Sequence, residues 1–518
     1  MRNNLITDNR QNIMPNPYIK KILKARVYDA AIETPLDEAK VLSKRIGNKV
    51  LLKREDLQPV FSFKVRGAYN KMAQLSAAER SVGVITASAG NHAQGLAMSS
   101  KIMGVKAVIV MPKITPSIKV DNVIALGGNV ILYGDSFDQA KKHAEQLATE
   151  HGYTYCPPFD DPDVIAGQGT IAMEILKQYS GHIDAIFVPV GGGGLIAGIA
   201  VYIKYLSPET KIIGVESSES ACLKAALEAG ERVILPHVGI FADGVAVAQI
   251  GKHTFEIAQQ YVDDVITVDT DEICAALKDI FDDTRSICEP SGALAVAGLK
   301  KYVHSTNCKQ KTLIAINSGA NMNFSRLRHI AERTDLGEKR EALFAAQISE
   351  KPGSFRQFCN TLGDRNITEF NYRYSDKDIA NILVGVTINP DSEEKSSLIN
   401  ELSNMDIPVE DLSDNEIAKI HIRYMIGGHS QTPDKNELVF RFEFPEKPGA
   451  LLKFLDTLGG RWNISMFHYR NHGSDFGRVL VAMQAEKEDK PNIIKFLAEI
   501  GYRYWEETDN KAFKLFLG

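Results

Sequence analysis

A lysine in an apolar setting is the first residue of this sequence that could do chemistry. Lys64 follows Phe61 and Phe63 and precedes Gly67, which allows tight backbone packing. An apolar environment lowers the pKa of a lysine amine, and Schiff-base chemistry requires the neutral amine. The alternative is an ordinary lysine at a helix start whose amine reaches solvent, which is the commoner case.

A turn of small residues is the second chemical feature. Ser88, Ala89, Gly90 and Asn91 follow an expected strand and lead into an expected helix. Free N–H groups at a helix N-terminus suit a carboxylate. The Asn91 amide adds a donor for an oxygen of a planar ligand, whereas the adjacent His92 is expected to be structural.

Four consecutive glycines form the third feature. Gly191, Gly192, Gly193 and Gly194 precede Leu195 and join an expected strand to an expected helix. Backbone amides in such a turn can converge on a phosphate, and the helix dipole adds to the attraction. The pattern is neither the spaced-glycine fingerprint of dinucleotide sites nor a nucleotide P-loop. It predicts a phosphate cup or, as the alternative, a tight structural turn.

Three more turn residues complete the set. Ser318 offers a neutral hydroxyl in a glycine turn at the end of the last expected strand. Gly244 and Glu289 stand in two further glycine-adjacent motifs and are expected to line a pocket. No residue pattern indicates a metal site.

The elements that must position these residues alternate along the chain from about Val27 to Arg328. Continuous apolar strands separated by helices predict mostly parallel sheets covered on both faces. Open α/β sheets bind ligands at turns after their strands, which is where the features above lie. The expected strands are 82–86, 106–111, 130–133, 185–190, 211–216 and 312–316, and the expected helices include 138–151 and 168–179.

A duplicated segment follows a charged stretch over residues 331–341. The motif that runs from Glu350 to Phe355 recurs from Glu446 to Leu451, 96 residues later. Each copy is expected to run strand, Pro-Gly turn, helix, strand, strand, helix, strand, which predicts a ferredoxin-like α+β domain. The alternative is a duplicated structural domain with no ligand.

Composition excludes several classes of protein. The 518 residues include 60 Lys and Arg against 65 Asp and Glu, so no basic excess indicates nucleic acid as a partner. No apolar run reaches the ~18 residues of a membrane span. The six cysteines are far apart, which argues against a disulfide scaffold or a zinc ribbon and favours a cytoplasmic location. Residues 1–26 are expected to be a lead-in without a secretion signal.

Taken in order, these blocks resemble the pyridoxal-phosphate (PLP) enzymes of the tryptophan synthase β family, fold type II. More narrowly, the chain is similar to the biosynthetic threonine deaminases (threonine ammonia-lyases), and the resemblance covers essentially the whole sequence. It implies a two-lobed α/β catalytic domain over 27–330 and a linker over 331–341. Two ACT-like regulatory domains would follow over 342–413 and 436–507.

The resemblance also implies a role for each site residue. Lys64 would hold PLP as a Schiff base, Phe63 would pack beside the ring, and Asn91 would bond the phenolic oxygen. Residues 191–195 would bind the phosphate, and Ser318 would face the pyridine nitrogen. The substrate carboxylate would lie on residues 88–91.

The implied reaction is the dehydration and deamination of L-threonine to 2-oxobutanoate and ammonia, the committed step of isoleucine biosynthesis, with L-serine as a further substrate. Isoleucine would inhibit the enzyme, and valine would oppose this inhibition. Both effectors would act through Glu350, Phe355, Glu446 and Leu451. The enzyme would be a homotetramer. The alternatives are an L-serine dehydratase or racemase of the same family, a short catabolic threonine deaminase, and a catalytically dead amino-acid sensor. The duplicated half argues against the enzymes among these alternatives, and the intact set of motifs argues against the sensor.

Overall fold

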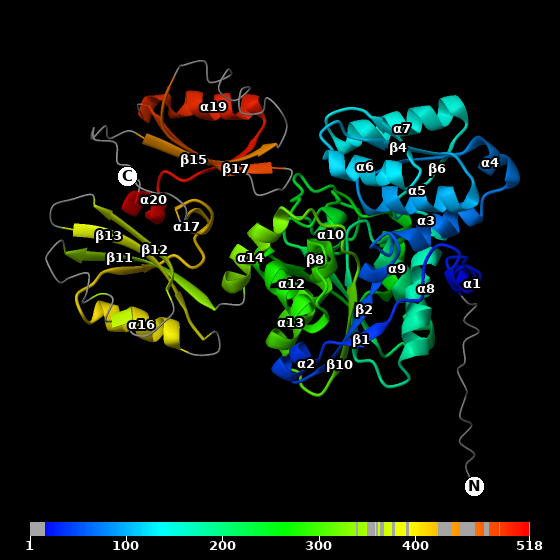
Figure 1. Cartoon of the computed structure of the whole chain (residues 1–518), viewed down its shortest axis with the longest axis horizontal. Coiled ribbons are helices and arrows are strands. Elements are labelled where there is room, and N and C mark those ends of the chain that lie inside the picture. Colours follow the sequence, from blue (N-terminus) through cyan, green and yellow to red (C-terminus); the bar gives the residue numbers. More distant parts are fainter. Residues whose placement is uncertain are drawn as a thin grey trace, which may run out of the picture. The chain divides into compact units, whose positions relative to one another are not determined.

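The computed structural model describes residues 16–337, 340–349, 358, 361–362, 367–374, 379–389, 393–422, 437–445, 462–470, 476–485 and 487–516. The chain divides into two compact units, Met1–Met322 and Asn323–Gly518 (Figure 1). The predicted effector residues Glu350, Phe355, Glu446 and Leu451 lie outside the described residues.

The first unit contains two sheets, each the centre of one lobe. The large lobe has a six-stranded sheet of order β1-β2-β10-β7-β8-β9, in which only the pairing of β1 with β2 is antiparallel. Its strands are β1 (Leu36–Glu38), β2 (Lys49–Arg54), β7 (Ala185–Pro189), β8 (Lys211–Ser217), β9 (Asp264–Val268) and β10 (Thr312–Asn317). The small lobe has an all-parallel sheet of order β5-β4-β3-β6, made of β3 (Val84–Ala87), β4 (Ala107–Met111), β5 (Asn129–Leu132) and β6 (Thr154–Tyr155).

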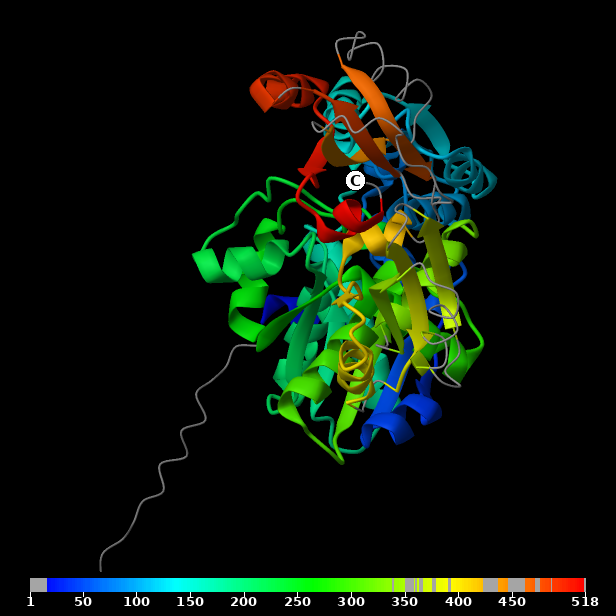
Figure 2. The same ribbon diagram turned by 90° about the vertical axis from the view of Figure 1, so that its left-hand side faces the viewer.

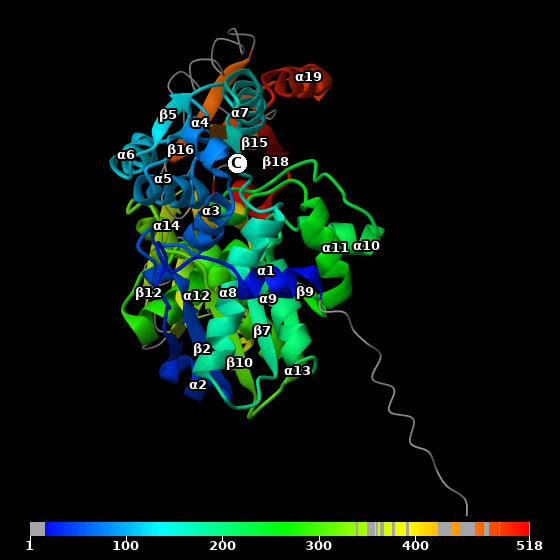
Figure 3. The same cartoon turned by 90° about the vertical axis from the view of Figure 1, so that its right-hand side faces the viewer.

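Helices connect these strands. They are α1 (Pro17–Leu23), α2 (Lys40–Ile46), α3 (Lys64–Ala73), α4 (Ala77–Val82), α5 (Asn91–Met103), α6 (Ser117–Ala125), α7 (Phe137–His151), α8 (Pro162–Gln178), α9 (Gly194–Leu206), α10 (Cys222–Ala229), α11 (Lys252–Tyr261), α12 (Thr270–Thr284) and α13 (Pro290–Thr306), with the 3-10 turns η1 (Glu55–Leu57) and η2 (Asp243–Val245). In the large lobe, α8 and α9 lie side by side on one face of the sheet (Figure 3), and α13 packs on the other. The prediction of a two-lobed α/β fold with mostly parallel sheets is confirmed.

The apolar strands of the small lobe are continuous because both faces of its sheet are covered. Along β4, Val108 and Val110 pack with α7, whereas Ile109 and Met111 pack with α5 and α6. Successive strand residues point to opposite faces, so a strand between two helical layers must be apolar at every position.

Helix α3 lies at the junction of the two lobes. It packs against α5 of the small lobe and α8 of the large lobe (Figure 1). The contact with α8 is close, because a Cβ on Gly67 would lie 2.3 Å from Nε2 of Gln168. This helix begins at Lys64, so its placement decides where the lysine lies.

The second unit contains two antiparallel four-stranded sheets with the same strand order. One has the order β12-β13-β11-β14 and the other β16-β17-β15-β18. Their strands are β11 (Glu341–Ser349), β12 (Ile367–Tyr374), β13 (Ile379–Thr387), β14 (Val409–Asp411), β15 (Glu437–Pro445), β16 (Asn463–Arg470), β17 (Phe476–Gln484) and β18 (Arg503–Glu506). The register shift at Ile367/Glu369 recurs at Ile464/Met466, so the duplication extends to a local irregularity.

The helices of this unit are α14 (Arg326–Gly337), α16 (Glu394–Ser403), α17 (Glu416–Ile420), α19 (Lys490–Ile500) and α20 (Lys511–Phe516), with the 3-10 turn η4 (Lys487–Asp489). Helix α14 occupies most of the stretch that was expected to be a linker, and its Arg333 is buried and ion-paired with Glu416. Helix α16 covers one face of the first sheet, and α19 covers one face of the second.

The other faces of the two sheets share one core. Leu343 and Leu383 from the first repeat meet Val439 and Leu480 from the second, and Phe513 of α20 closes the cluster. Helices α17 and α20 lie side by side next to it (Figures 1 and 2). The period-2 pattern of β15 follows from this arrangement, because one face of the strand meets α19 and the other meets the first repeat.

Candidate active site

Lys64 starts α3 and its amine points into the first unit. The amine donates to the Pro158 carbonyl at 3.0 Å and lies 5.2 Å from the centroid of the Phe63 ring. Burial lowers the pKa of Lys64 to about 8, and the carboxylate of Glu289 opposes this shift. A substantial fraction of the amine is therefore neutral near physiological pH, as a nucleophile toward an aldehyde must be.

The loop before α3 is joined to the turn after β10, and this brings Lys64 to Ser318. The N–H of Phe63 donates to the Ser318 carbonyl at 3.3 Å, and Ser62 forms a bridge with Gly319. The Ser318 hydroxyl donates to the Ser291 carbonyl at 3.3 Å. Two segments more than 250 residues apart thus form one wall of the site.

The glycine cup, residues 191–195, is packed tightly on its outer side. A Cβ on Gly192 would lie 2.3 Å from the Phe159 ring, and one on Gly191 would lie 2.9 Å from Cα of Val245. The Gly192 carbonyl accepts from the Thr254 hydroxyl at 2.7 Å. Gly193 has a φ of +89° and precedes α9, whose first N–H groups have no acceptor within the helix. Free amides at a helix N-terminus of this kind can bind a phosphate.

Asn91 begins α5 and joins the small lobe to the large one. Its Nδ2 donates to Oε1 of Glu289 at 2.7 Å, and its Oδ1 accepts from Nδ2 of Asn321 at 2.7 Å. Nδ2 of Asn321 also donates to the Val60 carbonyl at 2.8 Å. The orientation of the Asn91 amide is therefore set by a carboxylate on one side and an amide on the other.

Residues 88–91, which we name the carboxylate turn, are partly exposed and end at Asn91. Its Gly90 is the N-cap of α5, so the free N–H groups of the helix start face the turn. The neighbouring His92 is buried, with Nε2 3.0 Å from the Cys156 carbonyl. Burial lowers the pKa of His92 to about 4, so the ring is neutral at physiological pH.

The structure brings the sequence-predicted residues of the first unit together. Lys64 and the glycine cup share the segment Pro158–Phe159, since the amine contacts Pro158 and Gly192 packs on Phe159. Gly244 lies beside Glu289, because its Cβ would be 3.2 Å from the Glu289 carboxylate. Among the described residues, no group of His, Cys, Asp or Glu could hold a metal ion.

Sequence reasoning missed four contributors to the site. Asn321 lies three residues after Ser318, at the end of the sequence Asn-Ser-Gly-Ala-Asn, so its position was a usable signal. Three others carry no such signal: the Pro158 carbonyl, the Phe159 ring and the Thr254 hydroxyl meet the site only in the fold.

Two family models match the chain. One, described as pyridoxal-phosphate dependent enzyme, matches residues 27–319, and the other, described as C-terminal regulatory domain of threonine dehydratase, matches 332–422 and 428–517. Over 500 residues the chain is 55% identical to the biosynthetic L-threonine dehydratase of Salmonella typhimurium, which covers 96% of this chain and 97% of that protein. The chain belongs to the threonine dehydratase family.

Other members of the threonine dehydratase family show the same relation. The mitochondrial enzyme of Saccharomyces cerevisiae is 49% identical over 514 residues, covering 96% of this chain and 89% of its own. Among solved structures, threonine deaminase isoform 2 from Solanum lycopersicum aligns with a TM-score of 0.60 at 52% identity, covering 61% of this chain and 92% of that chain.

The residues of the site fit the cofactor of this PLP-dependent family. The Lys64 amine suits the aldehyde, and the glycine cup suits the phosphate. Near Ser318, the hydroxyl of the buried Ser291 and the side-chain amide of the buried Asn317 have no hydrogen-bond partner within the part of the chain that the structure describes. Buried polar atoms usually have partners, so these two groups suit a site that a polar ligand or an ordered water completes.

Proposed function

We propose that the chain dehydrates and deaminates L-threonine to 2-oxobutanoate and ammonia, with L-serine as a further substrate. The observation that carries this proposal is the meeting of Lys64, Asn91 and the glycine cup in one unit of a chain 55% identical to a biosynthetic L-threonine dehydratase. The reaction would be the committed step of isoleucine biosynthesis.

The residues of the chain divide the work of this reaction. PLP, when bound, supplies an electron sink for the bond broken at Cα. Lys64 holds the cofactor and then takes the Cα proton, for which a pKa of about 8 suits its amine. The carboxylate turn binds the substrate carboxylate. The β-hydroxyl would leave with one proton as water, which balances the proton lost from Cα. The enamine, freed when Lys64 takes back the cofactor, would then react with water to give 2-oxobutanoate and ammonia.

Ser318 supports elimination over competing reactions. A neutral hydroxyl can form a hydrogen bond with the ring nitrogen and leave it unprotonated. An aspartic acid in the same place would protonate that nitrogen. The electron sink is then weaker, and a weaker sink favours prompt loss of the β-hydroxyl over transamination.

The test is an absorbance spectrum followed by a 2-oxo-acid assay with threonine and with serine. We expect the absorbance of a lysine-bound cofactor and turnover of threonine, and we expect Lys64→Ala to lose both. Cofactor absorbance without 2-oxo-acid formation would indicate a catalytically dead sensor. Product from serine alone, or racemised serine, would indicate the serine-specific relatives instead.

We also propose that the second unit makes the enzyme sensitive to isoleucine, with valine in opposition, through Glu350, Phe355, Glu446 and Leu451. The match of residues 332–422 and 428–517 to a regulatory-domain model supports this proposal. A chain ending after residue 341 should keep threonine turnover and lose isoleucine inhibition. An active truncated chain with unchanged isoleucine sensitivity would contradict the assignment.

A homotetramer and a cytoplasmic location complete the proposal. Coupling between sites requires two states that bind the effector differently, and subunit contacts commonly supply them. Five cysteines of the described chain are free thiols, which fits a reducing compartment. Light scattering of the full chain tests the tetramer. Separately, no helix in the described residues is long and apolar enough to span a membrane.

A further inference from the structure

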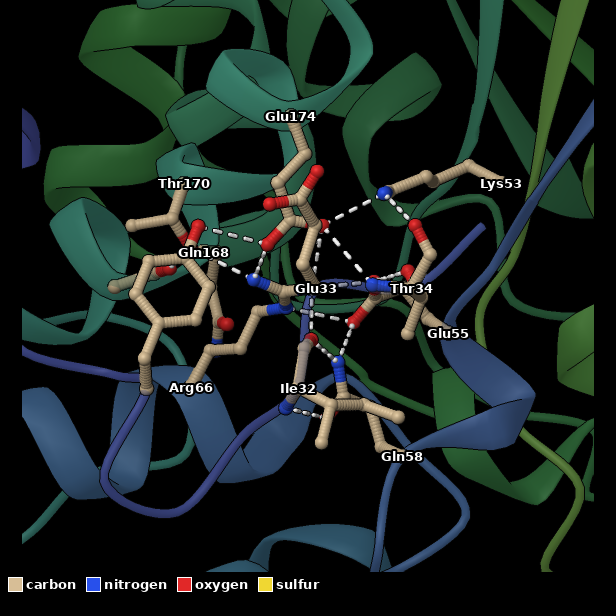
Figure 4. A network of polar contacts seen from close by, with 12 residues as sticks. Ile32, Glu33, Thr34, Lys53, Glu55, Gln58, Arg66, Gln168, Thr170 and Glu174 are labelled. Carbon is tan, nitrogen blue, oxygen red and sulfur yellow. Dashed lines mark hydrogen bonds and ion pairs between the residues drawn. The ribbon is translucent and has the colours of Figure 1, made fainter. Parts of the chain in front are cut away.

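Four charged side chains are buried together beside α3 (Figure 4). Lys53, Glu55 and Arg66 have no exposed surface, and Glu174 is 2% exposed. Two cations and two anions leave no net charge. We name this set the buried ion network.

The guanidinium of Arg66 is held from several directions. Its Nε and Nη2 donate to the Glu55 carboxylate at 2.7 Å each, and its Nη1 and Nη2 donate to the Glu174 carboxylate at 2.5 and 2.9 Å. Nη1 also donates to the Thr170 hydroxyl, and Nη2 to the Ile32 carbonyl, both at 3.1 Å. Because the guanidinium is a rigid plane, contacts with two carboxylates fix its position and its rotation.

The partners of Arg66 belong to the large lobe. Glu55 begins η1 directly after β2, and Glu174 lies on α8. Lys53 of β2 donates to the Glu174 carboxylate and to the Thr34 carbonyl, both at 2.6 Å. The network therefore connects α3 to the sheet whose strand β10 precedes Ser318, and to α8, which covers that sheet.

The backbones of α3 and α8 lie in close contact beside the buried ion network. A Cβ on Gly167 would lie 2.7 Å from the Arg66 carbonyl oxygen and from Cα of Gly67. The N–H of Gly67 donates to Oε1 of Gln168 at 3.2 Å. Helix α3 is thus held by direct backbone contact as well as by charge.

We propose that Arg66 is a positioning residue for Lys64, which stands two residues earlier in the same helical turn. Through the buried ion network it fixes the first turn of α3 to the large lobe. The glycine cup and Ser318 belong to that lobe, whereas the carboxylate turn belongs to the small lobe. The amine then keeps its distance from the cofactor's phosphate and ring sites when the carboxylate turn adjusts to a substrate.

A stability role alone does not account for this arrangement. Replacing a buried ion pair with apolar side chains of similar volume is often neutral or stabilising, whereas removing one partner leaves an unpaired buried charge. What charged pairs offer here is directional contact. The inference rests on the proposed function, so its experiment separates positioning from folding and from turnover.

The experiment uses the full chain with a charge-balanced double variant, Arg66→Met/Glu55→Met, which leaves the Lys53–Glu174 pair in place. The matched control is Arg54→Met/Asp56→Met. It removes another buried pair of the same strand end, joined at 2.8 Å, whose other side-chain hydrogen bonds within the described residues go to Asp37 and Ser286 rather than to α3. The measurements are the melting temperature of the cofactor-free chain, the rate at which added PLP acquires the absorbance of the lysine-bound form, the affinity for pyridoxamine 5′-phosphate, and kcat and KM for threonine.

For the Arg66→Met/Glu55→Met variant we expect PLP capture and kcat to fall about tenfold to a hundredfold, since displacement of a reacting group by 1 Å can cost that much. KM, and the affinity for pyridoxamine 5′-phosphate, which cannot form a Schiff base with lysine, should stay within about twofold. The control variant should capture PLP at the wild-type rate.

Wild-type capture and kcat in a folded double variant would overturn the proposal, as would equal losses in the control. If the double variant does not fold, Arg66→Lys decides instead, because it keeps the charge and loses the fork. It should show the same split between kcat and KM, and wild-type values would overturn the proposal. Should the wild type capture PLP and not turn over threonine, the proposed function fails while the capture rates still test positioning.

Discussion

Replacing Gly192 with alanine tests the glycine cup from its outer side. The φ of Gly192 is one that alanine adopts, so the substitution acts only through the steric contacts of the added methyl group. The added Cβ would lie 2.3 Å from Cγ and Cδ1 of Phe159, which belong to a rigid ring and not to the end of a flexible side chain. Carbon atoms in contact are ~3.5 Å apart, so the turn or the ring must move by about 1.2 Å.

The expected magnitude follows from that displacement. Overpacking a site of this kind costs about 1–3 kcal/mol. In the cofactor-free chain the turn can relax away from Phe159, but a bound phosphate requires its amides to converge. Most of the free-energy cost of overpacking therefore destabilises the PLP-bound chain and not the cofactor-free chain. At about 1.4 kcal/mol per tenfold change in affinity, PLP should bind about 5- to 150-fold more weakly.

The assay is a PLP titration of the cofactor-free chain, followed by absorbance, with a second change as a control for mechanism. Phe159→Leu should make room for the new methyl group and recover part of the affinity in the Gly192→Ala background. On its own it should weaken binding much less than Gly192→Ala does. Wild-type affinity in Gly192→Ala, or a double variant no better than Gly192→Ala, would refute the reasoning.

Three further predictions follow from other parts of the chain. Because burial lowers the pKa of Lys64 to about 8, half of the amine is neutral at that pH, so the rate of PLP capture should rise with pH with a midpoint near 8 and level off above it. Glu289→Gln should move this midpoint downward, because the carboxylate raises the pKa of Lys64, and a midpoint near 10 would contradict the buried setting. Asn321→Ala removes the donor to Asn91 and should weaken PLP binding about two- to tenfold, the worth of one neutral hydrogen bond, with no loss in urea stability beyond ~1.5 kcal/mol. Phe513→Ala in the core shared by the two repeats should cost about 3–5 kcal/mol in urea unfolding, whereas Lys511→Ala, whose side chain is 70% exposed, should cost less than ~1 kcal/mol.

Buried strands were the easiest elements to predict. The expected strand 106–111 is β4 (Ala107–Met111), and 211–216 is β8 (Lys211–Ser217), because sheets covered on both faces require unbroken apolar runs. The edge strand β5 was expected at 130–133, but the edge strands β9, which is only partly buried, and β6, which has two residues, were missed. These two lack the apolar signal that burial on both faces imposes. The buried strand β2 was missed as well, because its apolar run ends in Lys53 and Arg54, whose charges are paired only in the fold.

Helix boundaries were less accurate for a local reason. Helix α8 begins at Pro162, six residues before the expected start at Gln168. Its signal was a cap, since Asp161 accepts from the N–H groups of Asp163 and Val164 and proline stands at the first helical position. Val82, placed in an expected strand, ends α4 instead.

The site could be predicted only as far as its motifs reach. Each motif supplies its own turn, so Lys64, Asn91 and the glycine cup could be chosen one at a time. The contact between Asn91 and Asn321 spans 230 residues, and Phe159 packs its ring on the glycine cup from a separate loop. No local pattern encodes such a meeting.

The buried ion network also sets an order in which the chain can fold. Arg66 cannot leave water without both of its carboxylates, and Glu174 follows it by 108 residues. The strands of the small lobe lie within that interval, so their sheet can form first. Closing so long a loop is slow. The helix that bears the reactive lysine should therefore be among the last parts of the first unit to gain protection from hydrogen exchange during refolding.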